Sequence, residues 1–152
     1  MPHRLAIVTG ASGFICCASI SVVSALSLIG PRSISFAENH PARGESLESS
    51  LRDVSDGQLA LQEAVEMLSK GSDVHIFVVG HADSNECLRN DCQALSDRRA
   101  QLVYEWLVAH GVETKQLEGR MGLSSSEPVD SSDTEEQRRH NRLVEFRLIY
   151  PQ

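Results

Sequence analysis

Basic residues are scarce in this chain of 152 residues, in which 14 Lys and Arg stand against 21 Asp and Glu. The first 37 residues hold only two of those bases, Arg4 and Arg32, and no acid. The remaining residues therefore carry 12 bases against 21 acids, a formal charge of −9. Because nucleic-acid binding depends on basic side chains that neutralise phosphates, this composition argues against a nucleic-acid partner.

The chain also lacks the length for a second large domain, because 152 residues suffice for one hydrophobic core of ordinary size. Hydrophobic residues make up 41% and charged residues 23%, which is the balance of a globular protein rather than a disordered or fibrous one. We therefore expect one folded domain.

A glycine-rich turn near the start lacks the other features of a nucleotide site. Residues 8–15 (VTGASGFI) resemble the phosphate-binding turn of short-chain dehydrogenases, in which glycines let the backbone approach a pyrophosphate. Cys16 stands in place of the third glycine, and no Tyr-x-x-x-Lys pair occurs in the sequence. No long series of strand and helix units follows, so we expect no nucleotide and no other cofactor.

Residues 1–37 have the pattern of an export signal. Arg4 precedes a long uncharged stretch, and Ser35 and Ala37 are small residues at the third and last positions before Glu38. This pattern fits a signal-peptidase cut after Ala37. The alternative is an uncleaved membrane anchor over residues 13–30, which is close to the short limit for crossing a bilayer and is weakened by its serines. Both interpretations place the rest of the chain outside the cytoplasm, in the periplasm or cell envelope.

Cysteines are few as well. Two of the four lie in the export signal, without the small-residue context of a lipid-anchored protein. Cys87 and Cys92 are five positions apart in a polar loop, where an oxidising compartment favours a disulfide. A metal site that includes His81 and Asp83 is the alternative, but Cys-x-x-Cys spacing and a second ligand pair are missing. We expect the disulfide and no metal.

The exported part divides into a linker and a folded region. Residues 38–50 (ENHPARGESLESS) are polar and contain a proline and a glycine, which predicts a flexible linker before a domain over residues 51–152. Apolar residues at steps of three and four predict a helix over residues 58–70. No strand is evident before that helix.

Further elements follow in alternation. The β-branched run 74–79 predicts a buried strand, and Ser96 is expected to cap a helix that Gly111 ends. A strand over residues 116–122, a short helix over 134–140 and a last strand over 143–150 complete the order. This order predicts an α/β (α+β) fold with helices packed on one sheet.

Short motifs stand at defined places in this order. Residues 80–84 (GHADS) follow the buried strand, residues 95–100 (LSDRRA) lie in the next helix, and residues 141–145 (NRLVE) begin the last strand. Matching positions between and around these motifs are Gly111, Val112, Leu117, Gly122, Pro128, Thr134 and Arg138. Together they resemble the OmpA-like peptidoglycan-binding domain family over about residues 57–149. The chain departs from the family at Ala82 (usually Thr), Leu143 (usually Arg) and Cys92 (usually Asn), and its loop between Asp83 and Leu95 is about one residue longer.

The resemblance implies a two-layer sandwich with helices on one mixed sheet, and non-covalent binding of peptidoglycan. The implied ligand is diaminopimelate of the stem peptide, whose free end carries an ammonium and a carboxylate. Asp83 would accept from the ammonium, and Arg99 would hold the carboxylate with paired donors near a helix start. His81, Asn141 and Arg142 are further candidates for lining or fixing this site.

Other interpretations of these residues remain. Asp83 alone is also typical of a turn cap, and Arg99 of a surface ion pair. If the two are mutually distant or are buried in unrelated pairs, a divergent module that binds an envelope protein is favoured. Reduced cysteines converging with His81 would favour a small enzyme or metal protein. Because Ser84, His81 and Asp83 share one short turn, unlike the dispersed residues of nucleophilic catalysis, we expect no enzyme activity.

Overall fold

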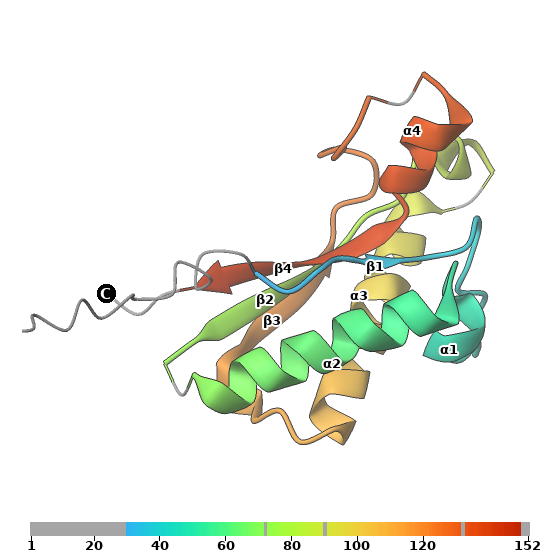
Figure 1. Ribbon diagram of the computed structural model, residues 1–152. Coiled ribbons are helices and arrows are strands. Elements are labelled where there is room, and N and C mark those ends of the chain that lie inside the picture. Colours follow the sequence, from blue (N-terminus) through green and yellow to red (C-terminus); the bar gives the residue numbers. More distant parts are fainter. Residues whose placement is uncertain (1–29, 72, 90, 132, 150–152) are drawn as a thin grey trace, which may run out of the picture.

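The computed structural model describes residues 30–71, 73–89, 91–131 and 133–149. One mixed sheet has the strand order β1-β4-β2-β3 (Figure 1). Its strands are β1 (Ile34–Ser35), β2 (His75–Gly80), β3 (Leu117–Gly122) and β4 (Leu143–Ile149). The helices are α1 (Leu47–Ser50), α2 (Val54–Lys70), α3 (Cys92–Ala109) and α4 (Glu135–His140), with short 3₁₀ helices η2 (Glu86–Leu88) and η3 (Thr114–Gln116). β2 is central, since it pairs parallel with β3 and antiparallel with β4.

Helices α2 and α3 pack on one face of the sheet. Ile76 and Val78, two residues apart on β2, point to the same face and are fully buried. They share one core cluster with α2 and α3, whose contributing residues are Ala60, Leu61, Ala64, Leu68, Ala100, Val103 and Leu107. The predicted two-layer α/β fold is therefore confirmed.

The end of β2 lies unusually close to α3. A Cβ atom added at Gly80 would overlap the carbonyl oxygen of Ser96, so only glycine lets the strand approach the helix this closely. Gly80 thus sets the chain that follows β2 directly beside the first turns of α3.

Residues 30–50 belong to the folded body, which differs from the sequence expectation of a signal end and a flexible linker. β1 pairs antiparallel with β4, and the side chains of Ile34 and Phe36 are 0% and 1% exposed. Leu47 of α1 is buried in the same core. β1 has only two residues, so it shows no alternating pattern, and its sequence fits the end of an export signal. The cut after Ala37 stays a prediction, and residues 1–29 of the signal or anchor lie outside the described residues.

The start of α3 corrects a second expectation. Asp91, not Ser96, caps this helix, with its carboxylate accepting from the N–H of Ala94 at 3.1 Å. Ser96 is buried inside the helix, where its hydroxyl donates to the carbonyl of Gln93 and accepts from the N–H of Ser124. The helix therefore begins five residues earlier than predicted, and Ser96 joins it to the loop after β3.

The remaining elements agree closely with the sequence. α2 begins four residues before the predicted start, at Val54, because Asp53 caps it through the N–H of Asp56. The strands expected over 74–79, 116–122 and 143–150 correspond to β2, β3 and β4, and Thr134 caps α4 with a capping box. None of the helices in the described part of the chain is long and apolar enough to cross a membrane.

Candidate functional site

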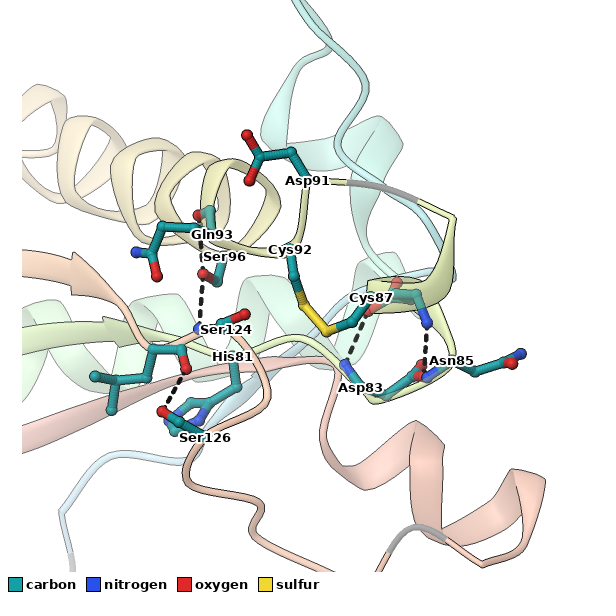
Figure 2. The surroundings of a disulfide bond; sticks show 12 residues. His81, Asp83, Asn85, Cys87, Asp91, Cys92, Gln93, Ser96, Ser124 and Ser126 are labelled. Carbon is teal, nitrogen blue, oxygen red and sulfur yellow. Dashed lines mark hydrogen bonds between the residues drawn. A yellow bond between two sulfur atoms is a disulfide. The ribbon is translucent and has the colours of Figure 1, made fainter.

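Three segments meet at the carboxyl end of β2. His81, Ala82 and Asp83 leave the strand and are all buried, and α3 runs beside them. Arg142 immediately precedes β4, the antiparallel neighbour of β2, and is also buried. Figure 2 shows the loop after Asp83 joined to the first turn of α3 by a disulfide. Charged residues that are far apart in the sequence are therefore buried together at the carboxyl end of β2.

Asp83 is fully buried and uses both carboxylate oxygens. Oδ1 accepts from the backbone N–H groups of Asn85 at 2.6 Å and Glu86 at 3.0 Å, which makes Asp83 a turn cap. Oδ2 accepts from Nε of Arg142 in an ion pair. Asp83 is therefore both a turn cap and the ion-pair partner of Arg142.

Arg99 is 0% exposed, and each of its five N–H donors has an acceptor. Nε donates to the carbonyl of His40 at 2.8 Å, and the two terminal nitrogens donate to the carbonyls of His81 at 2.8 Å and Ala37 at 3.2 Å. The same two nitrogens hold the carboxylate of Glu86 at 2.9 and 2.7 Å. Arg99 is therefore a buried, bidentate ion-pair partner and not a surface one.

Glu86 is a buried residue of this site that sequence reasoning missed. Its carboxylate is 0% exposed and, besides Arg99, accepts from the N–H groups of Asp83 at 3.1 Å and Asn39 at 2.6 Å. A single glutamate in a polar loop carries no periodic or motif signal, so nothing in the sequence distinguished it. The next residue, Cys87, forms the disulfide with Cys92, which confirms that predicted pair.

Arg142 closes the other side of the site. Besides Asp83, its guanidinium contacts the carboxylate of Glu135 at 3.0 and 3.2 Å, and Glu38 lies 3.8 Å away. Burial lowers the pKa of Arg142, but hydrogen bonds to Asp83 and Glu135 outweigh it and leave the pKa raised. Arg142 is therefore a permanent cation against Asp83. A cavity of about 420 Å³ opens beside it, lined by Phe36, Ala37, Glu38, Arg52, Glu135, Arg139 and Arg142.

His81 and Asn141 have mainly structural contacts. Nε2 of His81 lies 3.2 Å from the carboxylate of Glu145, and Nδ1 is buried with no hydrogen-bond partner among the described residues. The side-chain oxygen of Asn141 accepts from the N–H groups of Val129 and Asp130, which fixes the loop before α4. The site therefore brings together Asp83, Arg99 and Arg142 through their side chains, and His81 only through its carbonyl.

Asp83 and Arg99 are thus neighbours, since both contact Glu86, but each is buried in a pair with another residue. Burial of both residues in separate pairs is the arrangement that, in the sequence analysis, favoured a module that binds an envelope protein. No three His, Cys, Asp or Glu side chains of the described ranges are grouped so that they could hold a metal ion.

The ion pair of Arg142 with Glu135 predicts a pH effect. The hydrogen bond from Arg142 lowers the pKa of Glu135 below its ordinary value of 4.5, so the folded state binds its proton less readily than the unfolded chain. This stabilisation is present above pH 4.5 and is lost as the pH falls through the lowered folded value. We expect the urea midpoint to fall less between pH 7 and pH 3 in Glu135→Gln than in the wild type. Glu136→Gln, an exposed neighbour, is the matched control, and equal falls in all three proteins would contradict the prediction.

Comparisons with known proteins agree with this fold. The model of the OmpA family matches residues 49–142. The C-terminal domain of Helicobacter pylori MotB is 22% identical with a TM-score of 0.63, over 81% of this chain and 89% of that one. The peptidoglycan-associated lipoprotein of Burkholderia pseudomallei is 25% identical with a TM-score of 0.59, over 78% of this chain and 90% of that one. A putative MotB-like protein from Desulfovibrio vulgaris is 23% identical with a TM-score of 0.53, over 63% and 61% of the two chains. Among curated proteins, none matches this sequence.

Proposed function

We propose that this chain, which belongs to the OmpA family, binds peptidoglycan non-covalently through the free end of diaminopimelate in the stem peptide. The family match spans both the GHADS segment and the helix that carries Arg99. The likeness to a peptidoglycan-associated lipoprotein supports the same ligand class. Such binding would anchor or position a component of the cell envelope, in the periplasm.

The observation that carries this proposal is the pattern of charges around Asp83 and Arg99. A carboxylate, that of Glu86, lies on the guanidinium of Arg99, and a cation, that of Arg142, lies on Asp83. The free end of diaminopimelate has one carboxylate and one ammonium on the same carbon. The site therefore offers Arg99 for the ligand's carboxylate and Asp83 for its ammonium. These two residues are close together, since both contact Glu86.

Binding is tested by titrating the full chain with a wall peptide that contains diaminopimelate. Asp83→Asn removes the charge that would hold the ammonium, and we expect it to weaken binding at least about tenfold, which corresponds to ~1.4 kcal/mol. Asp133→Asn, an exposed aspartate, is the matched control and should bind as the wild type does. Both proteins need to show the wild-type circular dichroism spectrum.

A chemical control separates the two halves of the ligand. The same peptide with the free carboxylate of its diaminopimelate amidated loses the group that Arg99 would hold, so we expect its binding to be at least tenfold weaker. Equal affinity for both peptides, or undiminished binding by folded Asp83→Asn, would contradict the proposed site.

A second candidate function is a module that binds an envelope protein. It is favoured by the burial of Asp83 and Arg99 in pairs with Arg142 and Glu86. No binding of the wall peptide by the folded wild type at millimolar concentration would favour this function over the first.

A further inference from the structure

We propose that Glu86 is an internal ligand of the site: its carboxylate occupies the place of the wall peptide's carboxylate, and it must leave before the wall peptide can bind. This inference rests on the proposed function for the identity of the incoming ligand. The internal occupation itself is tested separately, with a probe that is not a wall fragment.

Four donors surround the carboxylate of Glu86. One oxygen accepts from Arg99 at 2.7 Å and from the N–H of Asn39 at 2.6 Å, and the other accepts from Arg99 at 2.9 Å and from the N–H of Asp83 at 3.1 Å. Two guanidinium donors and two backbone donors converge on one carboxylate. Such a cradle suits any carboxylate of the same size, whether it belongs to the chain or to a ligand.

Glu86 contacts both halves of the site. The N–H of Glu86 donates to Oδ1 of Asp83, while its side chain covers Arg99. Withdrawal of Glu86 therefore exposes the guanidinium fork of Arg99 and removes one of the two backbone donors on Oδ1 of Asp83, the other being the N–H of Asn85. A zwitterion needs a free cation and a free anion at the same time, and Glu86 is the residue that contacts both.

The loop that carries Glu86 buries little apolar surface. Within residues 84–89, Glu86 is buried, whereas Ser84 and Arg89 are exposed and the side chain of Leu88 is 82% exposed. With little apolar surface buried, the loop loses few contacts when it moves. The N–H groups of Asn85 and Cys87 also bind Asp83, and the disulfide between Cys87 and Cys92 ties the loop to α3 (Figure 2).

This exchange gives the site a selectivity. A ligand that brings a carboxylate replaces the charge that Glu86 removes from Arg99, so the buried cation stays paired. A neutral ligand would leave Arg99 buried without a counter-charge, which is strongly unfavourable. The closed site therefore selects for ligands with an unmodified carboxylate.

Carboxylate rescue tests the internal ligand. Glu86→Ala leaves a space the size of acetate on Arg99, so sodium acetate should raise the melting temperature of this variant above its value in sodium chloride of equal ionic strength. At a tenfold excess over the dissociation constant, we expect a rise of about 5 °C. The wild type and the matched control Glu48→Ala, an exposed glutamate, should respond equally to the two salts. An equal response of folded Glu86→Ala to both salts would overturn the inference.

Glu86→Gln provides the second readout if the alanine variant does not fold. It keeps the shape of the side chain and removes its charge, so it competes less well for Arg99, and we expect the wall peptide to bind it several-fold more tightly than the wild type. Unchanged or weaker affinity would count against the internal ligand. Acetate rescue in Glu86→Ala, together with no binding of wall peptide by any variant, would uphold the internal ligand and reject the proposed function.

Discussion

Replacement of Arg99 with methionine is expected to lower the free energy of unfolding by about 3–5 kcal/mol. The substitution leaves the carboxylate of Glu86 buried without its cation, and loss of one partner of a buried ion pair has a cost of this size. The carbonyls of Ala37, His40 and His81 also lose a donor. Equilibrium urea unfolding measures the difference.

Arg98→Met is the matched control for this prediction. Arg98 lies one position away on α3, is half-buried and donates to the carbonyl of Pro41 at 3.1 Å. We expect its replacement to cost about 1 kcal/mol or less. The double variant Arg99→Met with Glu86→Leu should regain much of the lost stability, since an apolar pair replaces the buried ions. Equal costs for Arg98→Met and Arg99→Met would contradict the buried-pair account.

Removal of residues 1–37 is expected to cost more than about 5 kcal/mol, which is comparable to the whole stability of an ordinary domain. The deletion takes β1 from the edge of the sheet and the fully buried side chains of Ile34 and Phe36 from the core. It also removes the carbonyl of Ala37 that accepts from Arg99. The shortened chain, residues 38–152, should therefore lack a cooperative unfolding transition.

The matched control begins at Gly30 and keeps every described residue. We expect this protein to unfold cooperatively, with the urea midpoint of the full chain. A stable, cooperatively folded chain of residues 38–152 would show that β1 is dispensable. It would also make the predicted cut after Ala37 compatible with this fold.

The elements that the sequence predicted well are those with local signals. The apolar period of α2, the β-branched run of β2 and the capping Thr134 of α4 each depend on neighbouring residues only, and all three lie near their predicted places. β1 escaped prediction because it has two residues and is stabilised by pairing with β4, more than a hundred positions away. Asp and Ser are both common caps, so local sequence does not distinguish Asp91 from Ser96. In the structure Asp91 caps α3, and Ser96 binds the loop after β3 instead.

The candidate site was predicted in its residues but not in its pairings. Family motifs singled out Asp83, Arg99 and Arg142, which the structure places together. Their partners depend on contacts 59 and 13 positions apart, from Arg142 to Asp83 and from Arg99 to Glu86. Such contacts leave no periodic trace in a single sequence. Burial of Arg99 was equally hidden, since arginine is mostly found at surfaces.

An NMR titration of the ¹⁵N-labelled full chain with the diaminopimelate wall peptide shows whether Asp83 and Arg99 form the binding site. We expect saturable shifts of the Arg99 side-chain Nε–H and of the backbone amides of Asn85 and Glu86, which donate to Asp83 in the protein without ligand. Those signals should change together, because ligand entry displaces Glu86 from both charges. Saturable shifts confined to other parts of the domain, or no shifts at millimolar peptide, would contradict the claim that Asp83 and Arg99 form the wall-binding site.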